Sequence, residues 1–351
     1  MKPLIIGDLI TKIPVIQGGM GIGISRENLA SAVSNAGGLG VISGINIGYD
    51  EEGFSKNPLS TNLKALKKYI QKAKELSNNK PIGINLMVAM NFYEEHVKTA
   101  IEAGIDIIIS GAGLPVKLPK FVGDSNVKIA PIVSSAKACR LLLKMWDKKY
   151  NKTADMIVIE GPKAGGHLGF HREELENIDS IDYDGEFIKI LEITKEYGKK
   201  YNKEIPVIAA GGISTSSDVK KYIDMGASGV QVGTLFVPTE ECDADISFKN
   251  SYIECKKEDI KIVKSPVGLP GRSIYNKFLD KLQTTKPKIT KCYNCMETCN
   301  PSSTPYCISQ ALINAVNGDI DNALLFCGAD AYKINKIKTV KEVIDDLISE
   351  I

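Results

Sequence analysis

The sequence predicts an α/β fold, a (β/α)₈ TIM barrel of residues 1–285 followed by a small cysteine-rich helical segment of residues 286–351. Two observations predict the barrel: short apolar runs alternate with helix-like stretches, and glycines directly follow many of these runs. Short, continuously apolar strands are typical of parallel sheets that are covered by helices. Eight such strand–helix units close into a barrel.

The apolar runs are brief, rich in branched residues and bounded by turn residues, which predicts buried strands. They are residues 13–16, 38–43, 81–88, 106–110, 128–133, 155–159, 206–213 and 229–236. Most of the intervening stretches have helical periodicity, and the predicted helices are residues 25–36, 62–77, 92–103, 136–150, 186–201 and 217–225. Ser25 is the expected N-cap of the first helix, and His96 is expected to face solvent.

A doubly wound sheet is the alternative fold. That fold carries the motif G-x-G-x-x-G directly after its first strand. Here the run Gly-Met-Gly-Ile-Gly at residues 19–23 does not have that spacing. The barrel is therefore the preferred fold.

The composition is that of an ordinary globular protein. The chain has 351 residues, 43% of them hydrophobic, and a net charge of +2, so no basic field indicates nucleic acid or an anionic membrane as a partner. It has no apolar stretch long enough for a signal peptide or a membrane span. We expect a cytoplasmic protein with a small-molecule substrate; self-association into a homo-oligomer is left open.

One loop carries a candidate for proton chemistry. Glu160 ends the sixth apolar run, and Gly165, Gly166 and His167 follow it. Adjacent glycines let backbone N–H groups approach an anion, and a histidine beside them can transfer a proton near neutral pH. A glycine-rich turn with a structural histidine is the alternative. His171, in the same loop, is expected at the surface.

Glycines also end the last two predicted strands. Barrel active sites lie at the carboxyl ends of the strands, and phosphate groups commonly bind after strands seven and eight. The residues at these two ends are Gly211, Gly212, Gln231, Gly233 and Thr234. They predict a phosphate site, unless the glycines only tighten the turns.

Seven stretches in this order resemble the flavin-dependent nitronate monooxygenase family, formerly called 2-nitropropane dioxygenases. They resemble equally the flavin-dependent enoyl-acyl-carrier-protein reductases of the same fold. The stretches are residues 14–20, 36–40, 83–87, 111–113, 164–167, 206–213 and 226–234, with a weaker match at 268–272. Together they are specific for the superfamily and discriminate poorly among its activities.

The resemblance implies a barrel that holds FMN and that uses His167 as the active-site histidine. The implied cofactor contacts are Gln17, Gly18, Gly19 and Met20 along the isoalloxazine ring, Asn85 at its polar edge, Glu160 at a flavin-contacting position, and Gly165, Gly166, Gly212, Gly233 and Thr234 around the phosphate, with Gln231 nearby. Lys163 departs from the acidic residue that the family often has there.

Two activities remain open. In a nitronate monooxygenase, His167 would bind the anionic alkyl nitronate or abstract an α-proton, and dioxygen would complete the oxidation. In a reductase of an enoyl thioester or related acceptor, NAD(P)H would be the reductant and His167 would orient the substrate. We prefer the first, although Glu160 is more typical of the second. A flavin carrier without turnover is a third hypothesis.

Four cysteines near the C-terminus have the spacing C-x₂-C-x₃-C-x₇-C: Cys292, Cys295, Cys299 and Cys307. Four thiolates can surround a metal or an iron–sulfur cluster, and the order resembles the cluster-binding stretch of old-yellow-enzyme-like dienoyl-CoA reductases. Reduced cysteines that pack a helical cap are the alternative. Residues 311–316, 321–326 and 340–348 are the helices predicted beyond this cluster.

Overall fold

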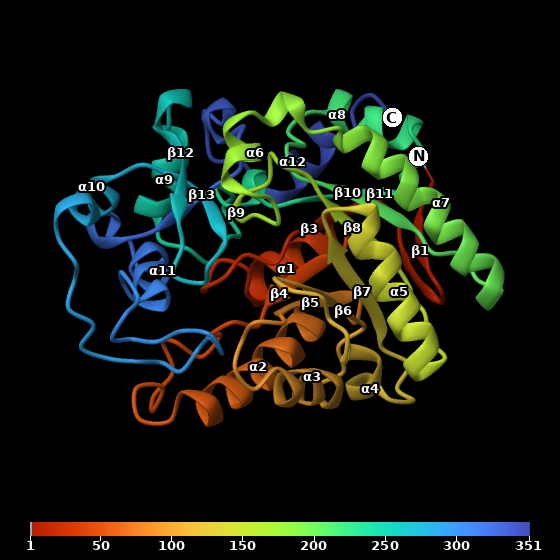
Figure 1. The fold of residues 1–351 in the computed structure, drawn as a ribbon, viewed down its shortest axis with the longest axis horizontal. Coiled ribbons are helices and arrows are strands. Elements are labelled where there is room, and N and C mark those ends of the chain that lie inside the picture. The colour runs from red at the N-terminus through yellow and green to blue at the C-terminus, as the bar shows by residue number, and fades with distance from the viewer. Residues whose placement is uncertain (1) are drawn as a thin grey trace.

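The computed structural model describes residues 2–351, and its centre is an eight-stranded parallel sheet in the order β3-β11-β10-β8-β7-β6-β5-β4 (Figure 1). An isolated parallel bridge between Ile16 and Leu39 joins the two ends of the sheet, so the strands form a barrel. Each strand overlaps one of the predicted apolar runs. Their bounds are β3 (Val15–Gln17), β4 (Gly40–Ser43), β5 (Ile82–Met87), β6 (Ile107–Gly111), β7 (Lys128–Val133), β8 (Ile157–Glu160), β10 (Val207–Ala210) and β11 (Gly229–Val232).

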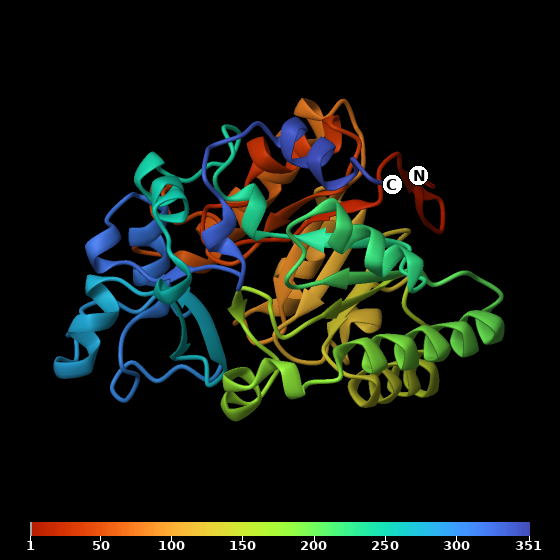
Figure 2. The same ribbon diagram turned by 90° about the horizontal axis from the view of Figure 1, so that it is seen from above.

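Helices cover the outside of the sheet (Figures 1 and 2). They are α1 (Glu27–Asn35), α2 (Pro58–Leu76), α3 (Tyr93–Glu102), α4 (Leu118–Val122), α5 (Ala136–Tyr150), α7 (Tyr183–Tyr201) and α8 (Ser216–Asp224). The N-cap of α1 is Arg26 and not Ser25 as predicted. The Ser25 hydroxyl instead accepts hydrogen bonds from the Gln17 amide and from the backbone N–H of Met20.

The barrel interior is filled by inward-facing side chains such as Ile16, Val41, Ile109, Val158 and Ile208. An N-terminal hairpin that the sequence did not predict, β1 (Leu4–Ile6) and β2 (Leu9–Thr11), joins the same apolar cluster through Leu4, Ile6 and Leu9. The interior is therefore packed, as in other barrels of this size.

A second, small antiparallel sheet lies beside the barrel. Its strands are β9 (Gly166–His167), β12 (Ile260–Lys264), β13 (Pro270–Ile274) and β14 (Leu325–Phe326). The predicted helix at 321–326 is wrong, because a short 3₁₀ turn (Ile320–Asn322) leads into β14, whose residues pair with β13. Tertiary pairing here overrides a helix-compatible local pattern.

The remaining helices are α6 (Arg172–Glu176), α9 (Ile246–Ile253), α10 (Lys277–Thr284), α11 (Ile308–Val316) and α12 (Val340–Leu347). Two of them, α11 and α12, confirm predicted helices of the C-terminal segment. In Figure 2 the chain beyond residue 285 returns to the barrel, and α12 contacts α1 and α8. The division into two domains at residue 285 stays a prediction. Residues on both sides of that boundary share the second sheet.

Candidate active site

A cavity of about 480 Å³ opens at the carboxyl ends of the barrel strands. Its wall includes His167 and every predicted cofactor residue except Gln17. These wall residues are Gly18, Gly19, Met20, Asn85, Glu160, Gly165, Gly166, Gly211, Gly212, Gln231, Gly233 and Thr234. Strand ends that are far apart in the sequence therefore meet at one site, as the barrel requires.

Gln17 does not line this cavity. Its side chain is fully buried, and its amide oxygen accepts a hydrogen bond from the backbone N–H of Val41 at 3.0 Å. The amide nitrogen donates to Ser25 and to the Gly18 carbonyl. Gln17 thus connects β3 to β4 and fixes the loop that carries Gly18 and Gly19, so its role is structural support of the site.

The cradle expected for a phosphate is formed after β10 and β11. Gly212 has a φ of +78°, and a Cβ at this position would lie 2.7 Å from the Cβ of Lys163. The Lys163 side chain therefore lies against the cradle. Within residues 2–351, it forms no ion pair with a carboxylate. Thr234 Oγ1 accepts a hydrogen bond from the backbone N–H of Gly328 at 3.0 Å, which leaves its hydroxyl hydrogen available to a ligand.

The glycine-rich loop after β8 is held from two sides. A Cβ on Gly165 would lie 2.6 Å from the carbonyl carbon of Cys327, so only glycine allows this close approach of the C-terminal segment. On the other side, the buried Arg272 guanidinium donates to the Ala164 carbonyl. The loop that presents His167 is thus clamped between β13 and the segment after β14.

His167 lines the cavity, and its half-buried ring packs against Ser265 and Phe326. Its Nε2 lies 2.7 Å from the Ser265 hydroxyl, and the Phe326 ring packs edge-on at a centroid distance of 4.9 Å. Burial lowers the pKa of His167 to about 4, because the charged imidazolium loses its hydration. The ring is therefore neutral at physiological pH and can donate one hydrogen bond while accepting another.

Glu160 lies at the floor of the cavity, at the end of β8. The structure gives its carboxyl no hydrogen-bond or ion-pair partner within residues 2–351. Burial raises its pKa to about 7. Glu160 is thus partly protonated at neutral pH and can both donate to and accept from a bound ligand, which fits a flavin-contacting position.

Apolar side chains that the sequence did not predict complete the cavity wall. They come from the turn between β12 and β13 and from the C-terminal segment, and are Val267, Leu269, Met296, Ile308, Leu312 and Phe326. The sequence signals near them were the weak motif match at 268–272, the cysteine motif and the predicted helix 311–316, none of which indicated a cavity wall. A polar floor with an apolar outer wall suits a substrate that joins a polar group to an alkyl chain.

A family model described as nitronate monooxygenase matches residues 2–350. The chain belongs to the nitronate monooxygenase family. It is therefore an oxidoreductase of this superfamily, as the sequence predicted.

Curated relatives carry the family's name, and solved structures share the fold. A probable nitronate monooxygenase of Staphylococcus saprophyticus is 27% identical over 301 residues, covering 79% of each chain. The structure of FabK from Thermotoga maritima has a TM-score of 0.72 and 27% identity, covering 97% of this chain and 93% of that one. Nitroalkane oxidase from Streptomyces ansochromogenes (TM-score 0.71, 19% identity, 97% and 96% covered) shares the fold.

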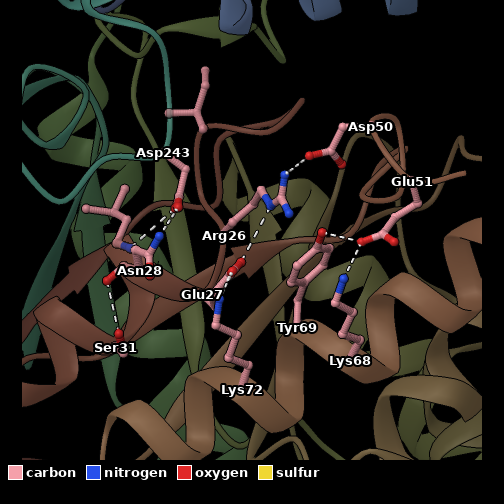
Figure 3. Close-up of polar contacts among 12 residues, drawn as sticks. Arg26, Glu27, Asn28, Ser31, Asp50, Glu51, Lys68, Tyr69, Lys72 and Asp243 are labelled. Atoms are coloured by element: carbon pink, nitrogen blue, oxygen red, sulfur yellow. Dashed lines mark hydrogen bonds and ion pairs between the residues drawn. The ribbon is translucent and has the colours of Figure 1, made fainter.

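A partly buried ionic cluster surrounds Arg26 and Glu27 at the start of α1 (Figure 3). Arg26 donates to Asp50 at 2.7 Å, lies 3.5 Å from the Glu27 carboxylate and covers the Tyr69 ring at 4.0 Å. The Asp243 carboxylate accepts from the side chain of Asn28 on α1. The cluster joins the loop that carries Asp50 and the loop after β11 to the start of α1, and through Tyr69 and Lys72 to the second half of α2.

The structure does not bring the four clustered cysteines into a metal-binding arrangement. Within residues 2–351, no group of three or more His, Cys, Asp and Glu side chains is positioned to hold a metal ion. Burial raises the pKa of the Cys295 thiol to about 11 and favours the neutral thiol. A metal or iron–sulfur site at Cys292, Cys295, Cys299 and Cys307 has no support from this geometry. It stays a prediction that iron and sulfide analysis can test.

The other two histidines lie outside the cavity. His171 is exposed at the start of α6, as expected. His96 is 3% exposed and not solvated, because α3 packs it inward and its Nδ1 lies 2.8 Å from the Phe92 carbonyl. Among residues 2–351, no helix combines the length and apolar composition needed to cross a membrane.

Proposed function

We propose that this protein is an FMN-dependent oxidoreductase that oxidises alkyl nitronates with dioxygen, with His167 at the substrate. The observation that carries the proposal is the convergence of three features on one cavity. These are a glycine–threonine cradle after β10 and β11, a partner-free carboxyl at the end of β8, and a neutral histidine.

The cradle residues fit the FMN phosphate. Gly212 and Gly233 have no side chains of their own to cover their backbone N–H groups, and the Thr234 hydroxyl and the aliphatic part of the Lys163 side chain lie beside them. Gly18, Gly19, Met20 and Asn85 would then line the isoalloxazine ring. When bound, FMN supplies a reversible electron acceptor beside His167.

The chain's own residues would orient the nitronate. The neutral His167 ring would hydrogen-bond a nitronate oxygen, and the apolar wall of Leu269, Leu312 and Phe326 would hold the alkyl chain and exclude water. Lys163 adds positive charge to the cavity rim, which favours an anionic substrate or cofactor.

An NAD(P)H-dependent reductase of an enoyl thioester is the second candidate. It is favoured by Glu160 at the flavin-contacting position and by the similarity to FabK from Thermotoga maritima over nearly the whole chain. The same apolar wall would accept an acyl chain.

Two measurements test the proposal. Purified protein should be yellow and should release FMN on denaturation; a colourless protein that binds no added FMN contradicts both candidates. In air, an alkyl nitronate should cause oxygen consumption. Oxidation of NADH or NADPH that requires an enoyl thioester, without any nitronate-dependent oxygen uptake, would favour the reductase instead.

A further inference from the structure

Ser265 is a polar contact of His167 that the sequence did not single out. It is the first residue after β12, in the turn that leads to β13, and it is 2% exposed. Its Oγ lies 2.7 Å from His167 Nε2. The backbone supports this contact, because His167 is paired with Gly271 in β13 and the N–H of Leu168 donates to the Pro270 carbonyl at 2.9 Å.

The partners of Ser265 determine the direction of this hydrogen bond. Its Oγ accepts from the backbone N–H of Val267 at 3.4 Å. Within residues 2–351, the structure gives the Ser265 hydroxyl hydrogen one acceptor, which is His167 Nε2. A buried hydroxyl that did not use this acceptor would leave its hydrogen unpaired at a cost of about 1–3 kcal/mol. The Ser265 hydroxyl therefore donates, and Nε2 accepts.

A neutral imidazole whose Nε2 accepts must carry its proton on Nδ1. Nδ1 has no protein partner within the described chain, and it belongs to a side chain that lines the cavity. The edge-on Phe326 ring restricts rotation of the imidazole. The Nδ1–H group is thus available to a ligand in the cavity.

We propose that Ser265 is a positioning residue that holds His167 in the Nδ1–H tautomer, so that His167 donates a hydrogen bond to a substrate oxygen and does not act as a base. The oxygen would belong to a nitronate, or to a thioester carbonyl in the alternative activity. Only this identity of the ligand rests on the proposed function; the tautomer does not. The assignment also decides between the two roles expected for His167, anion binding and α-proton abstraction, in favour of binding.

The tautomer can be measured directly by ¹⁵N NMR on ring-labelled holoenzyme. The chain has three histidines, so His167→Gln assigns the relevant signal. We expect a protonated, pyrrole-type Nδ1 and an unprotonated, pyridine-type Nε2 at neutral pH. A protonated Nε2 in the unaltered enzyme would overturn the proposal.

Variants of Ser265 test its part in fixing the tautomer. Ser265→Ala should shift His167 toward the Nε2–H form and lower kcat/KM for the nitronate about tenfold. Ser265→Thr keeps the hydroxyl, so it should retain the Nδ1–H form and the kcat/KM of the unaltered enzyme. Ser273→Ala is the matched control, because Ser273 is buried on the same hairpin, bonds the Ile274 carbonyl and lies outside the cavity wall. It should leave the His167 spectrum unchanged.

An unaltered His167 spectrum in folded Ser265→Ala would also contradict the proposal, as would an equal change in Ser273→Ala. The NMR experiment needs no turnover. Absence of nitronate oxidation would therefore contradict the proposed function and leave the Ser265 assignment to be decided by the spectra.

Discussion

Glu160 and His167 are two titratable residues that face one cavity and that burial shifts toward their neutral forms. Burial raises the pKa of Glu160 to about 7 and lowers that of His167 to about 4. Near neutral pH the cavity therefore contains an uncharged imidazole and a partly protonated carboxyl. Such a pair can hydrogen-bond a ligand without the repulsion that a fixed anion would exert on a nitronate.

Replacement of His167 by Ala should lower turnover about 10²-fold or more, because the substrate loses its hydrogen-bonding side chain at the reacting group. Bound FMN should remain, since the cradle is elsewhere. Steady-state kinetics and the flavin absorbance measure the two effects. Unchanged turnover would remove His167 from the reaction.

Glu160→Gln should change how stability depends on pH in the FMN-free protein. The folded-state pKa of about 7 lies above the ordinary value of 4.5, so the folded protein binds the extra proton between these two values. Stability contributed by this group is present below pH 4.5 and is lost as the pH rises to about 7.

The Glu160→Gln variant should therefore lose less stability than the unaltered protein between pH 5 and pH 7.5, as measured by urea unfolding. The contribution of His167 has the opposite sign below pH 6.5 and is the same in both proteins, so it cancels in the comparison. Identical pH slopes would show that the pKa of Glu160 is not raised in the folded protein.

The loops after β10 and β11 form the cradle, and a substitution of Gly212 tests it. Gly212→Ala should weaken FMN binding about tenfold or more, because the new Cβ meets Lys163 and the φ of +78° is strained for alanine. Fluorescence titration of the FMN-free protein measures the affinity.

Gly104→Ala is the matched control for the cradle. Gly104 has a φ of +86°, but a Cβ there would meet no atom within 4 Å, and it lies outside the cavity. It should cost stability through backbone strain while FMN affinity stays the same. Equal losses of affinity in the two variants would show that the cradle geometry is not specific.

The Arg26 cluster connects the loops that carry Asp50 and Asp243 to α1 and α2. Arg26→Gln removes the cation that pairs with Asp50 and covers the Tyr69 ring, while Glu27 keeps Lys72 at 2.9 Å. It should destabilise the fold by about 2 kcal/mol in urea unfolding. Arg140→Gln is the control, because the Arg140–Glu196 pair is exposed and should contribute about 0–1 kcal/mol. If both variants lose the same small amount of unfolding free energy, the Arg26 cluster contributes no more than an exposed ion pair does.

The eight barrel strands and their glycine-rich ends could be predicted from the sequence because their signals are local. A strand such as β10 and its Gly211–Gly212 end are contiguous, and barrel closure then places all such ends together. The motifs also predicted which strand ends line the cavity, although the direction of the Gln17 side chain could not be predicted.

The parts that could not be predicted depend on contacts between distant segments. β14 forms because Leu325 and Phe326 pair with β13, and Asn46 bonds Ser309 across 263 residues. The Ser265–His167 contact and the apolar wall arise in the same way. The periodicity of hydrophobic residues within each segment does not predict that these segments meet at the cavity.

The whole molecule combines a closed barrel with a C-terminal segment that completes its active-site wall. The barrel supplies the polar floor and the cradle, and the segment after residue 285 supplies Met296, Ile308 and Leu312. Family membership shows that the protein is an oxidoreductase. The two candidate activities differ in the compound that would reduce the flavin, which is a nitronate in one and NADH or NADPH in the other.

Anaerobic mixing of the FMN-loaded protein with one reductant at a time is the most direct test of the proposed nitronate oxidation. An alkyl nitronate such as propionate 3-nitronate should bleach the flavin absorbance, whereas NADH and NADPH should not. Bleaching by NADH or NADPH together with no response to nitronates would contradict the nitronate monooxygenase assignment.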